Sequence, residues 1–134
     1  MRFVVTSFLI IVGVALFLSL QFSAKATTYR NIEASPYLLE RVASNDWLLI
    51  DVRSPEEYAD GHIPGAINMP HKRIDEYISE LQEYKDKPII LYCRSGRRAK
   101  LAMKVLQEQD FTDVMHLEGD ILGWNEAGYA VEKM

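Results

Sequence analysis

The residues best suited to chemistry in this 134-residue chain form the run from Cys93 to Arg98, which reads Cys-Arg-Ser-Gly-Arg-Arg. Cys93 is the only cysteine, so no intramolecular disulfide can form. The run also brings three arginines close to the sulfur, and arginine is the side chain best suited to bidentate recognition of oxyanions. We therefore expect a nucleophilic thiolate in a site that holds an anion.

The segments on either side of this run predict where it lies in the fold. Residues 88–92 (PIILY) are the most strand-like segment of the chain, and residues 97–109 carry apolar side chains at helical spacing. Cys93 is then at the carboxyl end of a parallel strand, where open α/β sheets bind their ligands. Backbone N–H groups of such a loop, together with the helix N-terminus, form a cradle for an anion and favour a thiolate.

The charges at the start of this helix have the reverse of the usual order. A helix prefers acids in its first turn, by about 0.3 to 1 kcal/mol each, yet the first acid here is Glu108. A buried inert cysteine beside a solvated basic face is the alternative interpretation. The combination of strand, Gly96, arginines and helix start favours a bound oxyanion or thiolate. The basic residues concerned are Arg94, Arg97, Arg98 and Lys100.

Strands and helices alternate along the rest of the chain, which predicts one α/β domain built on a mostly parallel sheet. Helices are expected after Ser35-Pro36 and Ser54-Pro55, which supply an N-cap and a proline at the first helical position. Glu57 completes a capping box with Ser54. Further helices are expected over residues 74–81, 97–109 and, short and preceded by a loop, within 119–128; strands are expected over 29–32, 47–52, 66–69, 88–92 and 113–117.

Residues 1–26 differ from the remainder and resemble a secretory signal. Arg2 precedes an apolar run over residues 3–22, and Ala24-Lys25-Ala26 has the A-x-A pattern that signal peptidase accepts. An uncleaved membrane anchor is the alternative, because residues 3–20 carry no charge and approach the minimum length that spans a bilayer. Both interpretations export the domain at 27–134, to the periplasm or to the outer side of the membrane.

Composition excludes two other classes of function. The chain has 15 basic and 19 acidic residues and a formal charge of −4, which disfavours a nucleic-acid partner. One cysteine and three histidines without metal-ligand spacing make a metal site improbable. The histidines are His62, His71 and His116.

Two motifs, in sequence order, resemble those of the single-domain rhodaneses. Residues 93–98 match the C-R-S-G-x-R active loop of that family, and residues 51–58 (DVRSPEEY) with 61–70 (GHIPGAINMP) match its upstream signature. The resemblance covers about residues 29–132. It implies a three-layer fold, with a five-stranded, mostly parallel sheet and helices on both faces, and an exported sulfurtransferase that needs no metal or organic cofactor.

The resemblance also implies a mechanism. Cys93 takes a sulfane sulfur from a small anionic donor such as thiosulfate, becomes a persulfide, and passes the sulfur to a thiophilic acceptor such as cyanide or a thiol. Arg94 and Arg98 would orient the donor, and the loop N–H groups would stabilise the anionic sulfur. The substrate-binding residues implied are Arg94, Ser95, Gly96, Arg97 and Arg98.

Alternatives remain open at this point. The protein could carry a persulfide to a partner protein, or it could act on phosphate or arsenate in the same cradle. The resemblance disfavours phosphate chemistry, because Cys93 and Arg98 have C-x4-R spacing, whereas the phosphatase relatives have C-x5-R.

Several conspicuous side chains are given structural roles. We expect Asp51 and Arg53 to form an internal ion pair that supports the loops. His62 is interpreted as a turn residue and His116 as a packed, hydrogen-bonded histidine. The remaining two, Tyr92 and Trp124, are assigned to strand and core packing.

Overall fold

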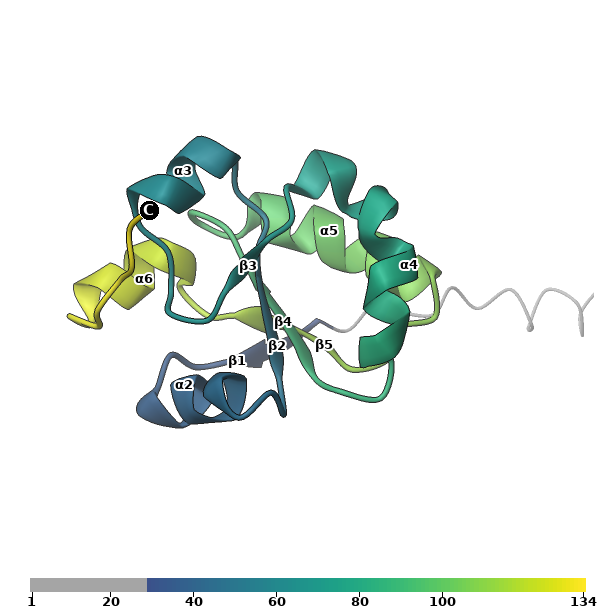
Figure 1. The fold of residues 1–134 in the computed structure, drawn as a ribbon, viewed down its shortest axis with the longest axis horizontal. Helices are drawn as coiled ribbons and strands as arrows, with labels where there is room; N and C mark the ends of the chain where they lie inside the picture. The colour runs from purple at the N-terminus through teal and green to yellow at the C-terminus, as the bar shows by residue number, and fades with distance from the viewer. Residues whose placement is uncertain (1–28) are drawn as a thin grey trace, which may run out of the picture.

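The computed structural model describes residues 29–134 (Figure 1). The leader or anchor expected at residues 1–26 lies outside the described residues. Within the part of the chain that is described, no helix combines the length and apolar character that a membrane span requires.

A five-stranded parallel sheet forms the centre of the domain, as predicted, with the strand order β1-β5-β4-β2-β3. Each neighbouring pair of strands is parallel. The expected strands were up to two residues too long, and the strand expected over 66–69 is reduced to two residues at the sheet edge. The observed strands are β1 (Arg30–Ile32), β2 (Leu48–Asp51), β3 (Ile67–Asn68), β4 (Ile89–Tyr92) and β5 (Val114–Leu117).

Helices cover both faces of the sheet, which gives the expected three layers (Figure 1). Successive strand residues point to opposite faces: Leu48 and Ile50 pack in one cluster, and Leu49 packs in the other. The first cluster also holds side chains of η1, α4 and α5, and the second holds side chains of α2 and α6. The helices are α2 (Pro36–Ala43), α3 (Pro55–Asp60), η1 (His71–Tyr77), α4 (Ile78–Leu81), η2 (Gln82–Tyr84), α5 (Arg97–Glu108) and α6 (Asp120–Glu126).

The predicted N-caps are present where the sequence placed them. Ser35 accepts a hydrogen bond from the Leu38 N–H at the start of α2. Ser54 and Glu57 form the reciprocal capping box of α3. These caps begin both helices within a few residues of a strand end and so fix the direction in which the chain leaves the sheet.

The single helix expected over residues 74–81 is wrong in its detail. The segment is a 3₁₀ helix over His71–Tyr77, and only Ile78–Leu81 is α-helical. Pro70 precedes the segment and provides no side-chain cap, so nothing fixes an α-helical first turn. Ile74 and Leu81 nevertheless reach the same core cluster.

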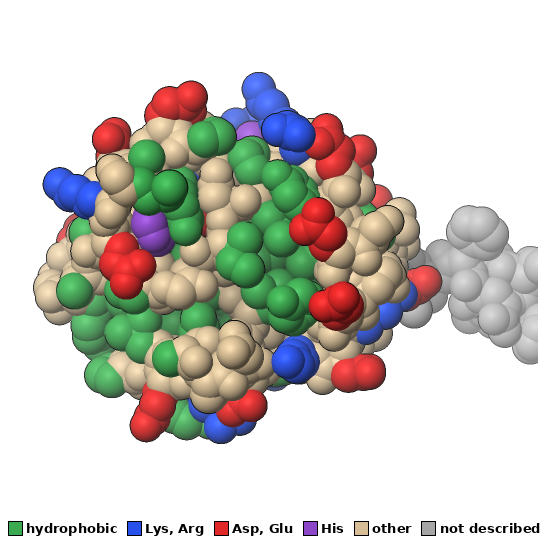
Figure 2. All heavy atoms as spheres, viewed as in Figure 1, with side chains coloured by type: hydrophobic (Ala, Val, Ile, Leu, Met, Phe, Trp, Pro, Cys, Tyr) green, Lys and Arg blue, Asp and Glu red, His purple; other side chains and the backbone are tan. Residues whose placement is uncertain are grey.

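The short edge strand leaves apolar surface beside it. Leu48, Ile67 and Leu81 line a pocket of about 270 Å³ that Glu80 and Glu83 border. Figure 2 shows this face as a hydrophobic area with acidic side chains at its margin. The pocket is built from β2, β3 and α4 rather than from the loop that follows β4.

Candidate active site

Cys93 directly follows β4, a strand in the interior of the sheet, at its carboxyl end. Its side chain is 2% exposed, and the N–H of Gly96 donates to its Sγ at 3.0 Å. The helix α5 begins at the next residue, Arg97. The sulfur therefore receives a backbone N–H at the positive end of a twelve-residue helix, and both features stabilise a negative charge on it.

Gly96 is required at its position for two reasons. Its φ of 117° lies in the region that side chains other than glycine rarely adopt. A Cβ at this residue would also lie 3.1 Å from Oδ2 of Asp120 and 3.4 Å from the ring of His116. The turn at Gly96, whose N–H binds Cys93, therefore packs closely against His116 of β5 and Asp120 of α6.

His116 and Asp120 hold the start of the Cys93 loop by hydrogen bonds. Oδ1 of Asp120 accepts the N–H of Cys93 at 2.9 Å, and Nε2 of His116 lies 3.0 and 2.9 Å from the two oxygens of Asp120. The N–H of Ile121 donates to the Cys93 carbonyl at 3.1 Å. His116 is packed and hydrogen-bonded, as expected, but sequence reasoning missed Asp120 altogether. The available signal was an acid directly after Gly119 and four residues after a histidine.

Arg98 is held by a carboxylate of the protein. Its Nη1 and Nη2 donate to the two oxygens of Glu57 at 2.6 and 2.9 Å. This ion pair, together with the bond from Ser54, lowers the pKa of Glu57 to about 2, and the same hydrogen bonds raise the pKa of Arg98. The expected role of Arg98 in orienting a donor stays a prediction, and the observed contact ties α5 to α3.

The loop residues expected to bind substrate are otherwise at the surface. The side chains of Arg94, Ser95 and Arg97 are exposed, whereas Gly96 is buried under them. Arg94 of the loop lines one pocket, and Arg98 at the start of α5 lines another.

The pocket beside Arg98 is cationic. It has a volume of about 440 Å³ and is lined by His71, Lys72, Arg73 and Arg98 with no acid among its lining residues. Burial, followed by the charges of Arg98, Lys72 and Arg97, lowers the pKa of His71. The excess of basic side chains in this lining suits an anion.

The pocket beside Arg94 has mixed charge. It has a volume of about 300 Å³, and Glu57 and Asp60 line it together with Arg53 and Arg94. Leu122 and Val131, both partly exposed, add apolar surface. This side of the loop is therefore less favourable for a doubly charged anion than the side at Arg98.

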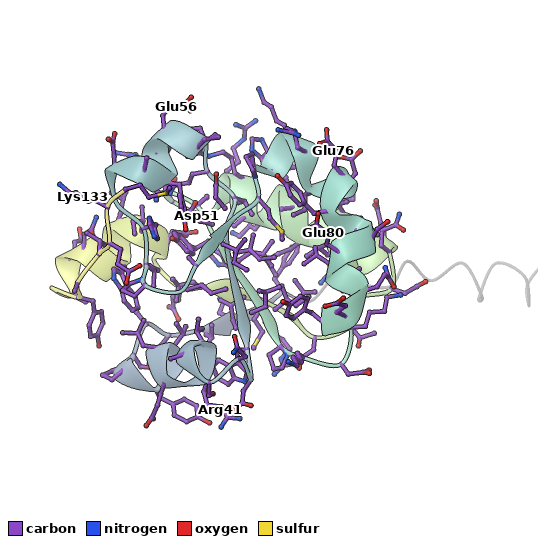
Figure 3. All side chains as sticks on the ribbon, viewed as in Figure 1. Arg41, Asp51, Glu56, Glu76, Glu80 and Lys133 are labelled. Atoms are coloured by element: carbon purple, nitrogen blue, oxygen red, sulfur yellow. The ribbon has the colours of Figure 1, made fainter. Side chains whose placement is uncertain are left out.

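Asp51 and Arg53 form the expected internal ion pair. Nη2 of Arg53 lies 2.7 Å from Oδ2 of Asp51 and donates to the carbonyl of Gly61 at 2.7 Å. Asn68 donates to the carbonyls of Asp51 and Arg53, both at 3.0 Å. Figure 3 shows Asp51 inside the molecule below α3, in contrast to the surface residues labelled around it. The pair thus ties the end of β2 to the end of α3, and its expected role in supporting the loops stays a prediction.

Tyr92 and Trp124 are buried, in agreement with their packing roles. The Tyr92 hydroxyl accepts the N–H of Ile63 at 3.0 Å, and burial beside Asp51 raises its pKa. His62 stacks on Tyr58 and exchanges backbone hydrogen bonds with Glu132 near the end of the chain. Across residues 29–134 no group of three potential ligands could hold a metal ion.

Comparison with known proteins assigns a family to this geometry. The model of a family described as rhodanese-like domain matches residues 35–127. A sulfurtransferase of Allochromatium vinosum is 38% identical over 98 residues, which cover 72% of this chain and 90% of that protein. Thiosulfate sulfurtransferase GlpE of Pseudoalteromonas translucida is 36% identical over 92 residues, covering 69% of this chain and 85% of that protein.

A solved structure agrees with these matches. The structure described as rhodanese with anions from E. coli is 32% identical, with a TM-score of 0.57, and the match covers 66% of this chain and 99% of that one. Other relatives are longer: the chain spans 60% of a Synechocystis protein and 29% of the tRNA uridine(34) hydroxylase of Acinetobacter baumannii.

Proposed function

Because the chain belongs to the rhodanese-like domain family, whose similar members include sulfurtransferases, we propose that it transfers sulfur through a persulfide on Cys93. The observation that carries the proposal is the 3.0 Å hydrogen bond from the Gly96 N–H to the Cys93 Sγ at the start of α5. This bond stabilises a negative charge on Sγ, both in the attacking thiolate and when the thiolate leaves again in the second half-reaction.

The reaction has two balanced steps. In the first, the Cys93 thiolate attacks the sulfane sulfur of thiosulfate, forms an S–S bond, and sulfite leaves with the electron pair of the old S–S bond. In the second, an acceptor such as cyanide or a thiolate attacks the outer sulfur, and the Cys93 thiolate leaves. No proton or external oxidant enters the balance, and the two half-reactions give ping-pong kinetics.

The pocket beside Arg98 supports an anionic donor. Its basic lining favours a dianion such as thiosulfate over a neutral or cationic ligand. The mixed pocket beside Arg94 suits a less highly charged thiophilic acceptor. A protein acceptor would receive the sulfur by the same second step.

A direct assay tests this function. Purified protein with thiosulfate and cyanide should form thiocyanate, and Cys93→Ser should form none because the nucleophile is removed. Ser79→Ala is the matched control, since it changes an exposed hydroxyl on α4, outside the loop, and should retain most of the rate. A reduced, folded wild-type protein that forms no thiocyanate, and no product with a thiol acceptor, would contradict the proposal.

We further propose that the domain acts outside the cytoplasm, on the strength of the apolar run and A-x-A pattern in residues 1–26. Residues 1–34 fused to a reporter that is active only after export should give reporter activity in a bacterium. Replacement of Leu9 and Ile10 by arginine should abolish it, because charges in the apolar run oppose membrane insertion. Activity that survives the replacement would contradict export through this segment.

A further inference from the structure

The carboxylate of Asp120 is the charged group bonded most directly to the nucleophile's own backbone. It is 1% exposed, and its oxygens are shared between the N–H of Cys93 and Nε2 of His116 at 2.9 to 3.0 Å. The next residue, Ile121, donates its N–H to the Cys93 carbonyl. Both backbone polar groups of Cys93 therefore bind the start of α6.

Asp120 also has an uncommon backbone conformation. Its φ is 54°, and it follows Gly119 with a φ of 81°. Aspartate and asparagine tolerate this left-handed region better than other side chains, but glycine would adopt it without cost. A strained residue that persists at a site is held by its surroundings, and here those surroundings are the loop of Cys93 and the ring of His116.

The charge of Asp120 opposes the chemistry of the loop above it. A buried carboxylate disfavours a second negative charge nearby, whether a thiolate, a persulfide or an anionic donor. His116 reduces that effect by donating to the carboxylate. Other charged or titratable groups lie near the loop: Asp51 at the end of β2 and Arg53 after it, Glu57 and Asp60 on α3, His71 on η1, and Arg94, Arg97 and Arg98 of the loop and α5.

We propose that Asp120, held by His116, is a positioning residue that fixes the start of the Cys93 loop and sets by its charge how readily the loop accepts a negative sulfur. The inference rests on Cys93 being the reacting group of the proposed function. The backbone conformation at residue 120 does not by itself require an aspartate, because glycine would adopt it without strain. The carboxylate therefore has a role of its own.

The variant Asp120→Asn separates charge from geometry. Asparagine tolerates the same φ and keeps an oxygen for the Cys93 N–H, but it carries no charge. The pH at which Cys93 reaches half of its maximal alkylation rate with iodoacetamide should fall by about half a unit or more. The KM for thiosulfate should fall about threefold or more, with a smaller change in kcat, because the loop no longer repels the anion.

His116→Phe should act in the opposite direction. Phenylalanine keeps most of the ring volume but cannot donate to Asp120, so the carboxylate exerts its full charge on the loop. The alkylation midpoint should then rise. A general loosening of the core would move both variants in the same direction, so opposite signs distinguish the proposed electrostatic role from a structural one.

Asp120→Gly tests the anchoring role. It removes the oxygen that accepts the Cys93 N–H and relieves the backbone strain at residue 120, so the domain should remain folded. Hydrogen exchange at the Cys93 amide should accelerate about tenfold or more, and the alkylation midpoint should fall as in Asp120→Asn. Asp113→Asn is the control, because this partly exposed residue pairs with Arg30 on the surface and should leave the midpoint unchanged.

The outcomes separate this inference from the proposed function, because alkylation requires no sulfur transfer. An unchanged midpoint in Asp120→Asn, or shifts of the same sign in Asp120→Asn and His116→Phe, would overturn the inference even if the wild type forms thiocyanate. The expected opposite shifts in a protein that forms no persulfide would support the inference and overturn the proposed function.

Discussion

Two buried pairs of an acid and a base lie at the carboxyl ends of β2 and β5, the two strands that neighbour β4, which Cys93 follows. Asp51 pairs with Arg53 after β2, and Asp120 pairs with His116 at the end of β5. The first pair binds its own loop, the carbonyl of Gly61 and, through backbone carbonyls, Asn68. The second binds the N–H of the nucleophile.

The difference between the pairs indicates that burial and charge alone do not define a role. Arg53 is permanently charged, so its pair with Asp51 fixes architecture at every ordinary pH. Asp120 instead shares its Oδ1 between Nε2 of His116 and the N–H of Cys93. We therefore expect the first pair to govern stability and the second to govern the reactivity of the sulfur.

The largest expected effect is the loss of stability in Arg53→Met. Methionine leaves Asp51 buried without its cation, which should lower the free energy of unfolding by about 3 to 5 kcal/mol. Asp120→Gly, at the other pair, should cost less because it removes the buried carboxylate, whereas Arg53→Met leaves one without its partner, and because it relieves a left-handed φ. Urea unfolding followed by circular dichroism measures both. Equal decreases in the free energy of unfolding would contradict the claim that the first pair governs stability more than the second.

The next effect concerns the contact between the second pair and the loop. Gly96→Ala should lower kcat/KM by about a hundredfold, because the new methyl group presses on Asp120 and His116 and displaces the N–H that binds Cys93. Gly128→Ala is the control: its φ of 78° is also left-handed, but a Cβ there meets nothing within 4 Å. It should cost about 1 kcal/mol of stability with activity retained. Similar kinetic losses in both would contradict the role of the contact.

The smallest effect tests the partly exposed ion pair between Glu57 and Arg98. Because the pKa of Glu57 is lowered from 4.5 to about 2, the pair adds stability that is present above about pH 4.5 and is lost as the pH falls toward 2. The wild type should lose stability in that range more steeply than Glu57→Gln. The effect is modest, since both side chains are partly exposed. Glu56→Gln, on the same helix, should follow the wild type in acid unfolding, and a wild-type profile for Glu57→Gln would contradict the assignment.

The sequence was sufficient to predict what depends on local pattern. The strand before Cys93, the loop glycine, the capping box of Ser54 and Glu57, and the ion pair of Asp51 and Arg53 all involve residues within a few positions of one another. Alternating strands and helices likewise led to the parallel sheet, because crossover connections place such strands side by side.

Contacts between distant segments could not be predicted in the same way. Asp120 meets Cys93 across 27 residues, and Glu57 meets Arg98 across 41. Glu57 was assigned a cap, which it forms, but its second partner depends on how α3 and α5 pack. The 3₁₀ segment at His71–Tyr77 was missed because helical spacing of apolar residues does not distinguish it from an α-helix over a few turns.

The most direct test of the account is the intact mass of the purified full-length protein before and after thiosulfate, and again after cyanide. We predict a gain of about 32 Da, one sulfur atom, that cyanide removes and that Cys93→Ser never shows. Absence of the gain in folded protein with a reduced thiol, or the same gain in Cys93→Ser, would contradict sulfur transfer through Cys93.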